Sequence, residues 1–136
     1  MTIRSAAEFI SLRDSEDPEL YRRAAHDDAP VDVWRDLVDH YAGYRKWVAH
    51  NKTVPADILR VLANDEDQEV RFFVAMKRRL PLEILDTLSR DTDDGIRLRV
   101  ARHKATSQEI LSRLATDPSK SVRDAVHDRL ENHDRN

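Results

Sequence analysis

The chain of 136 residues contains no cysteine, which excludes disulfides, thiolate metal ligands and a cysteine nucleophile. Only two glycines are present, so a glycine-rich loop that cradles phosphate is not expected. Long apolar runs are also absent. Charged residues recur every few positions in the first 17 residues, where a secretory signal or a membrane span would need an unbroken apolar segment. We therefore expect a cytoplasmic protein that does not associate with membranes.

Aromatic residues are scarce, at 6% of the chain, whereas charged residues make up 36%. This balance is typical of helices that have long solvated faces and pack through aliphatic side chains. A chain of this length fits one domain and buries roughly 68% of the surface that its unfolded form exposes. The net charge of −3 argues against a protein that coats nucleic acid with its whole surface, but it does not exclude a local basic patch.

Similar segments recur along the chain at a period of 25–26 residues. The segment that begins at Pro55 has later copies at Pro81 and Ser107 and an earlier copy at Pro30. Such a period is typical of solenoid proteins, in which each repeat buries its apolar face against its neighbours. We predict one repeat domain over residues 1–136. It consists of five repeats and a polar tail that frays: 5–29, 30–54, 55–80, 81–106, 107–130 and 131–136.

Four of the repeats open with an apolar pair and a further leucine at positions i, i+1 and i+4. This spacing places the three side chains on one face of a helix. A proline at the first helical position marks three of the helix starts, and Thr106 with Glu109 forms a capping box in the last repeat. The apolar residues are Val33, Trp34 and Leu37; Ile58, Leu59 and Leu62; Ile84, Leu85 and Leu88; and Ile110, Leu111 and Leu114.

A second helix follows a short acidic connection in each repeat, with apolar residues and one arginine on its inward stripe. In the first repeat the two helices are expected at 5–13, with Phe9 and Leu12 inward, and at 18–26. The repeat over 30–54 is one residue short and has Gly43 near the start of its second helix. The expected caps are Asp17, Asp67, Asp93 and Ser119. The stripes are Tyr44, Arg45, Val48 and Ala49; Val70, Arg71, Val74 and Ala75; Ile96, Arg97, Val100 and Ala101; and Val122, Arg123 and Val126.

The segments PADILRVLANDEDQEVRFFVA and SQEILSRLATDPSKSVRDAVH resemble the leucine-rich repeat variant family and, more broadly, HEAT-like α-solenoids. The resemblance covers roughly residues 15–130. Its strongest element is the pattern Leu-Ala-x-Asp followed by Arg-x-x-Val, seen from Leu62 to Val74 and from Leu114 to Val126. We therefore expect an all-α fold, a right-handed α-solenoid of about five short helical pairs. Variant leucine-rich repeats can have a 3-10 turn in place of one helix.

The resemblance also implies a structural role for an aspartate and an arginine six residues apart, which in HEAT-like proteins form a ladder of hydrogen bonds between successive repeats. The alternative interpretation is a row of arginines that binds phosphate. A structural pair is favoured because an arginine on an apolar stripe usually pairs with a nearby carboxylate. The pairs here are Asp39 and Arg45, Asp65 and Arg71, Asp91 and Arg97, and Asp117 and Arg123.

The remaining positions of the second helices vary between repeats, and variable positions are where repeat proteins usually bind their partners. They place an apolar centre within a basic rim, which suits a partner that offers a hydrophobic anchor and acidic flanks. The alternative is that Trp47 and Phe73 fill the core between adjacent helices. The predicted partner-binding surface consists of Lys46, Trp47, Phe72, Phe73, Met76, Lys77, Leu98, Arg99, Arg102 and His103.

Other site types find less support in the sequence. His26 and His50 fall in adjacent repeats, but no third metal ligand is apparent, so no metal and no cofactor are expected. The acidic connections lack the ligand spacing of a calcium loop. HEAT-like solenoids include DNA glycosylases, which would require Trp47 to lie near Asp124 or Asp128 in a basic groove.

We therefore predict a non-enzymatic interaction scaffold that binds a peptide or a partner protein on the concave face formed by the second helices. The alternative is a nucleic-acid-binding solenoid that uses the basic rim around Arg99 and Arg102. A third interpretation is self-association through the ends of the solenoid.

Overall fold

The computed structural model describes residues 1–135, with side chains placed through residue 132. Within this range the chain forms ten α-helices, one 3-10 helix and no strand beyond an isolated bridge between Thr2 and Asp28. The all-α prediction is therefore confirmed. The chain divides into two compact units, Met1–Val74 (unit 1) and Ala75–Asn136 (unit 2), and each unit is described by itself.

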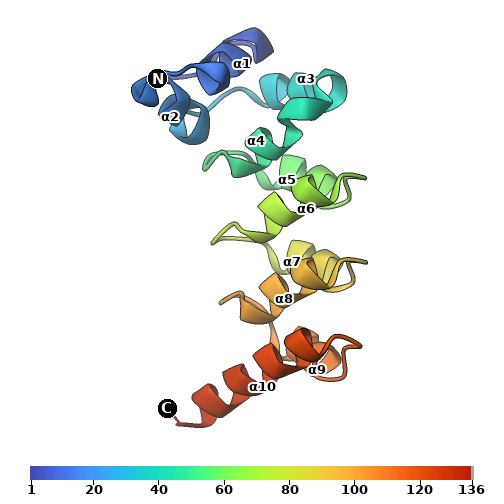
Figure 1. Cartoon of the computed structure of the whole chain (residues 1–136). Helices are drawn as coiled ribbons and strands as arrows, with labels where there is room; N and C mark the ends of the chain where they lie inside the picture. The colour runs from blue at the N-terminus through green and yellow to red at the C-terminus, as the bar shows by residue number, and fades with distance from the viewer. Residues whose placement is uncertain (136) are drawn as a thin grey trace. The chain divides into compact units, whose positions relative to one another are not determined.

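Two α-helices begin in each of the five predicted repeat ranges, and α10 runs past the last range to Arg135. Figure 1 shows the helices of each unit. Unit 1 contains α1 (Ala6–Asp14), α2 (Pro18–His26), α3 (Val31–His40), the 3-10 helix η1 (Ala42–Tyr44), α4 (Arg45–His50), α5 (Ala56–Leu62) and α6 (Gln68–Ala75), whose last residue already belongs to unit 2. Unit 2 contains α7 (Leu82–Ser89), α8 (Asp94–Arg102), α9 (Gln108–Leu114) and α10 (Lys120–Arg135).

Within each unit, paired helices pack on each other. First helices of consecutive pairs also pack together, and so do second helices. In unit 1, α1 packs on its pair partner α2, α1 also packs on α3, and α2 packs on α4. In unit 2, α7 packs on α8 and on α9, while α8 packs on α10. Because the α-helices have 6 to 16 residues, none of them buries its apolar stripe alone. Stacking one pair on the next supplies the missing surface.

The predicted inward residues of the first helices are all buried, so this part of the pattern is confirmed. Trp34 is 1% exposed, and its ring meets the edge of Phe9 with centroids 5.5 Å apart at 82°. Full burial of one large apolar side chain contributes roughly 1.5–3 kcal/mol. The buried first-helix residues are Phe9, Leu12, Val33, Trp34, Leu37, Ile58, Leu59, Leu62, Ile84, Leu85, Leu88, Ile110, Leu111 and Leu114.

Three of the expected aspartate caps accept backbone hydrogen bonds. The carboxylate oxygens of Asp17, Asp67 and Asp93 each accept from the amide two residues further on, at distances of 3.0, 2.9 and 3.4 Å. The prediction for Thr106 is wrong. Its buried hydroxyl donates to the Val100 carbonyl at 2.7 Å, and Ser107 caps α9 instead.

The prolines at the repeat starts also lie one position earlier than predicted. Pro30, Pro55 and Pro81 are the residues that precede the first helical turn, and Pro18 alone occupies a first helical position. Both placements use the same physical property, because proline lacks the N–H that a helix start leaves without a partner. The shift is within the usual uncertainty of a helix boundary.

The second helices are α-helices in every repeat. Among residues 1–135, the 3-10 geometry that variant leucine-rich repeats allow occurs only in η1, which contains Gly43 and lies in the predicted repeat that is one residue short. The expected fraying after Leu130 is wrong for residues 131–135, because α10 continues to Arg135. Residue 136 lies outside the described residues.

Candidate functional site

The arginines of the inward stripe are anchored to their own repeats. Nη1 of Arg71, Arg97 and Arg123 donates to the carbonyl of the aspartate six residues earlier, at 2.8, 2.8 and 2.7 Å. The side chains of those aspartates, Asp65, Asp91 and Asp117, accept the amide two residues further on, at 2.9, 2.9 and 2.8 Å. The six-residue spacing therefore corresponds to a bond from the guanidinium to the main chain.

Carboxylate contacts run instead between one repeat and the next. Nε and Nη2 of Arg97 donate to the two oxygens of Asp117 at 2.8 and 3.0 Å. In unit 1, Arg45 reaches Asp65 at 3.4 Å. Asp39 and Arg45 differ from the other three predicted pairs. Asp39 is exposed, and Nε of Arg45 donates to the Val38 carbonyl at 2.7 Å instead of the Asp39 carbonyl.

Electrostatics favour the charged forms of the Arg97 and Asp117 pair. Burial alone would raise the pKa of Asp117, but hydrogen bonds from Arg97 and from the Ser119 amide outweigh it and lower that pKa below the usual value. The same hydrogen bond raises the pKa of Arg97. Arg97 has its Nε, Nη1 and Nη2 donors engaged within unit 2, so it is not available as part of a phosphate-binding row.

A second row of inter-repeat contacts was missed by the sequence analysis. Asn51, His103 and Arg129 occupy one repeat position and each donates to backbone carbonyls of the preceding repeat. Nδ2 of Asn51 bonds to Ala24 at 2.8 Å and to Asp27 at 2.9 Å. The only sequence signal is a polar donor at intervals of 52 and 26 residues, and the residue type differs each time.

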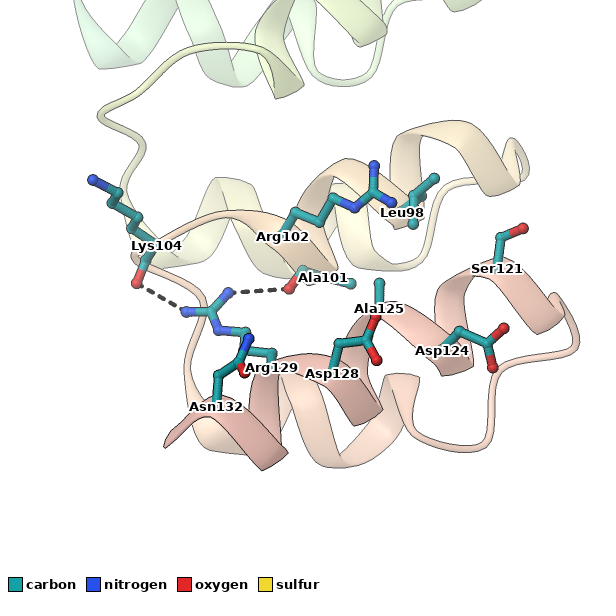
Figure 2. Close-up of a pocket in the computed structure, with 10 residues that line it drawn as sticks. All are labelled: Leu98, Ala101, Arg102, Lys104, Ser121, Asp124, Ala125, Asp128, Arg129 and Asn132. Carbon is teal, nitrogen blue, oxygen red and sulfur yellow. Dashed lines mark hydrogen bonds between the residues drawn. The ribbon is translucent and has the colours of Figure 1, made fainter. Parts of the chain in front are cut away.

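The row continues in unit 2. The Ala105 amide donates to Nδ1 of His103, so Nε2 carries the hydrogen that bonds to the Lys77 carbonyl at 2.8 Å. Arg129 donates to the carbonyls of Ala101 at 3.0 Å and Lys104 at 3.1 Å, as Figure 2 shows. His103 is only 9% exposed and both of its ring nitrogens bond to the main chain, so the side chain has a structural role, although it also lines a pocket of unit 2 with other predicted surface residues.

In unit 1 the predicted surface residues gather around Trp47. The Trp47 and Phe73 rings are both half-buried, with centroids 5.6 Å apart, and Phe72 is half-buried as well. Nζ of Lys46 lies 5.4 Å from the centre of the Trp47 ring and pairs with Glu69 at 3.2 Å. The Trp47 and Phe73 rings are therefore neither fully core nor fully exposed, because each packs on the other and keeps part of its surface in solvent.

Trp47 also lines a cleft that the sequence analysis did not identify. The cleft measures about 350 Å³, and the guanidinium of Arg13 lies in it 3.5 Å above the centre of the Trp47 ring. Arg13 comes from α1 and Trp47 from α4, so no local pattern connects them. The lining residues are Arg13, Tyr21, Arg22, Ala24, Ala25, His26, Trp47 and His50.

In unit 2 the predicted surface residues line two adjoining pockets. The first pocket, of about 470 Å³, is strongly basic, and no acidic side chain is among the described residues that line it. Arg78, Arg99, Arg102 and Lys104 make no side-chain hydrogen bond or ion pair with the described residues. The lining residues are Ala75, Met76, Lys77, Arg78, Arg99, Arg102, His103 and Lys104.

The second pocket is a wider groove of about 910 Å³ between α8 and α10 (Figure 2). It shares Arg102 and Lys104 with the basic pocket and is also lined by Leu98, Asp124 and Asp128. A hydrogen bond from Lys120 at 2.7 Å lowers the pKa of Asp124. Along unit 2 the surface thus changes from basic to acidic, and Leu98 lies on the basic side with Arg102.

The described residues contain no group of three or more histidine, aspartate or glutamate side chains placed to hold a metal ion. His26 and His50 do line the same unit 1 cleft. No described helix combines the length and the apolar character that crossing a membrane requires.

A scan against protein-family models, a search of curated proteins and a search of solved structures each found no match to this chain.

Proposed function

We propose that this protein is a short α-solenoid of the leucine-rich repeat variant or HEAT-like kind, and that it acts as a non-enzymatic module for protein interaction. The proposal is supported by the 25–26-residue recurrence and by the packing of like helices on each other within each unit. In such an arrangement the second helices keep one face for packing and leave the other for a partner.

One observation carries the binding function: four cations of the basic pocket of unit 2, Arg78, Arg99, Arg102 and Lys104, make no side-chain hydrogen bond or ion pair with the described residues. Arg99 and Arg102 come from α8 and Arg78 from the loop after α6, so two segments bring like charges together. Like charges at close range destabilise a fold unless a binding partner compensates for them. The pocket therefore suits a partner segment rich in aspartate and glutamate.

Apolar side chains at the same place supply the anchor. Met76 is 46% exposed and lines the basic pocket, and Leu98 lines the adjoining groove. Aromatic, Met and Arg side chains are enriched at protein interfaces, whereas lysine-rich surfaces are depleted there. We therefore propose an acidic peptide segment that inserts one apolar side chain between these residues.

The same cations make nucleic acid the second candidate. Arg78, Arg99, Arg102 and Lys104 could contact phosphates, since exposed unpaired arginine and lysine are the usual phosphate ligands. Asp124 and Asp128 in the adjoining groove oppose a long polyanion, because a phosphate backbone that crosses the groove would meet both carboxylates. A protein partner can place a basic residue against Asp124 and Asp128 and acidic residues against the basic pocket, which a phosphate backbone cannot do.

Fluorescence anisotropy with labelled ligands tests the proposal. The ligands are a peptide with one leucine flanked by glutamates, its lysine counterpart, and single-stranded and duplex oligonucleotides. We expect the acidic peptide to bind, and changing Arg99→Gln with Arg102→Gln to weaken binding at least tenfold, because each charge-assisted hydrogen bond is worth about 1.5–3 kcal/mol.

The matched control is Arg79→Gln with Arg90→Gln, which removes two exposed charges outside the pockets. We expect it to change the affinity by no more than about twofold, because salt screens charges that do not contact the peptide. Equal binding of the acidic and lysine peptides would contradict the proposal. Tight oligonucleotide binding that falls steeply with salt and is lost in the Arg99 and Arg102 variant would replace it with the second candidate.

A further inference from the structure

Arg13 in unit 1 is held in an unusual way for a surface cation. It lies in the last turn of α1, half-buried, with its guanidinium carbon 3.5 Å above the centre of the Trp47 ring and 5.9 Å from the centre of the Tyr21 ring. A guanidinium stacks on an aromatic face through cation–π attraction and keeps its N–H groups pointing outward in the plane. The stack therefore fixes the orientation of Arg13 without using its hydrogen-bond donors.

The two carboxylates of α1, Glu8 in its first turn and Asp14 at its last residue, are engaged elsewhere. Asp14 accepts the hydroxyl of Tyr44 at 2.6 Å, and Glu8 lies 3.7 Å from Arg23. Nε of Arg13 is buried and has no hydrogen-bond partner among the described residues. Arg113 also has a buried Nε without a partner, but its Nη2 bonds to Asp86 and Ser89. Arg13 makes no such compensating bond, so its Nη1 and Nη2 donors remain available to a ligand.

The cleft around Arg13 has the size and charge to receive one anionic group. Its volume of about 350 Å³ lies at the small end of the range of ligand sites, roughly 300–1,000 Å³. Arg13 and Arg22 line it together with His26, and no carboxylate is among the described lining residues. Trp47 and Tyr21 provide an apolar wall. A side chain with an apolar stem and a charged end matches this combination.

We propose that this cleft is a carboxylate-binding subsite, in which the Arg13 guanidinium receives one glutamate or aspartate side chain of a partner protein. The planar fork of Arg13 matches the two oxygens of a carboxylate. Because the Trp47 stack already orders the guanidinium, binding loses little side-chain entropy. The subsite extends the proposed function to unit 1. It rests on the proposed function in one respect, which is that the carboxylate belongs to a protein partner.

A single carboxylate is favoured over a polyanion because of the charge of the surrounding unit. Unit 1 has 10 lysines and arginines against 15 aspartates and glutamates, a net charge of −5. A long phosphate backbone would be repelled by the rest of this surface, whereas one carboxylate meets only the local field of Arg13 and Arg22. The occupant is therefore one acidic residue within a segment that is not itself strongly acidic.

Side-chain NMR on the full-length protein tests the proposal directly. The Arg13 Nε–H and Trp47 indole N–H signals are followed while N-acetyl-Gly-Glu-Gly-amide is added. The Trp34 indole is an internal control because its side chain is buried. We expect a saturable shift of both cleft signals with half-saturation at about 1–10 mM, the affinity of one charge-assisted contact, and no saturable shift with the matching Gln peptide.

Three variants make the result decisive. Arg13→Gln abolishes the shift of Trp47, and Arg13→Lys, which retains the charge but not the fork, weakens it at least fivefold. Arg35→Gln, an exposed change in α3 of the same unit, leaves it unaltered. Equal shifts with the Glu and Gln peptides, or saturation by inorganic phosphate and not by the Glu peptide, overturn the proposal. The backbone amides of Arg99 and Arg102 report on the unit 2 pocket in the same spectra, so a failure there is distinguished from a failure at Arg13.

Discussion

The two units build similar helix pairs from different side chains. All eight aromatic residues of the chain lie in unit 1, and unit 2 has none. Unit 1 carries a net charge of −5, whereas unit 2 has 13 lysines and arginines against 11 aspartates and glutamates, a net charge of +2. Unit 1 is thus acidic and contains the aromatic residues, whereas unit 2 is basic and packs through aliphatic side chains.

The difference in side chains between the two units is clear at one buried position of the first helices. Trp34 of α3 and Leu85 of α7 occupy the same place in their repeats and are 1% and 0% exposed. The extra volume of Trp34 is accommodated because Phe9 places its ring against the Trp34 edge. The repeat pattern therefore determines which positions are buried, and the neighbouring pair determines which side chain fits.

The largest expected effect is on this shared position. Changing Trp34→Ala removes a large ring and leaves Phe9 without its partner, so we expect a cost of about 3–5 kcal/mol in the free energy of unfolding. Leu85→Ala removes less volume and should cost about 2–4 kcal/mol. Urea unfolding followed by circular dichroism measures both. A smaller cost for Trp34→Ala than for Leu85→Ala would show that the aromatic half is the more loosely packed one.

The second comparison concerns the two inter-repeat ion pairs. Arg97 and Asp117 share two hydrogen bonds, and their side chains are 15% and 5% exposed, whereas Arg45 and Asp65 share one contact at 3.4 Å. Removing one partner of a buried pair leaves an uncompensated charge, so Asp117→Asn should cost about 3 kcal/mol. Asp65→Asn should cost about 1 kcal/mol. Urea unfolding at pH 7 tests the order.

The pH dependence of the same pair has a definite sign. Because the folded-state pKa of Asp117 is lowered, its contribution to stability is complete above the unfolded pKa, which is about 3.9, and is lost as the pH falls through the folded pKa. Stability measured from pH 7 to pH 2 should therefore decline in acid, and Asp117→Asn should flatten part of that decline. An unchanged slope would mean that Asp117 is not preferentially ionised by Arg97.

The smallest expected effect lies at the exposed contact between Tyr44 and Asp14. A hydrogen bond to Asp14 raises the pKa of Tyr44, so its contribution is present below the unfolded pKa of about 10 and is lost as the pH rises through the folded pKa. Tyr44→Phe should cost no more than about 0.5 kcal/mol at pH 7, because the contact is solvated. Melting temperatures of the two proteins should converge above pH 10, and a difference that grows there would contradict this account.

The core was predictable because burial follows a period. Ile58, Leu59 and Leu62 recur at equivalent positions in later repeats, and a helix with this spacing has one side that must be covered. The same reasoning located the aspartate caps at Asp17 and Asp93, since a carboxylate before a helix start has backbone amides within reach. These features depend on local geometry, which the sequence order contains.

The candidate sites were only partly predictable because they depend on contacts between segments. Arg13 and Trp47 are 34 positions apart, and nothing in either segment indicates that the two side chains stack. His103 was assigned to the partner-binding surface as a flanking residue, and nothing in the sequence indicates that its ring bonds to the Lys77 carbonyl and the Ala105 amide. The exposure of Met76 and the absence of acidic partners around Arg99 likewise became known only from the packing of the helices.

The row formed by Asn51, His103 and Arg129 has a consequence for which substitutions the chain tolerates. Each of these side chains binds main-chain carbonyls, which every amino acid provides, so the acceptor does not depend on the residue that the preceding repeat carries. A substitution in the segment that supplies these carbonyls therefore leaves the acceptors in place. An amide, an imidazole and a guanidinium therefore each fill the position in the three segments.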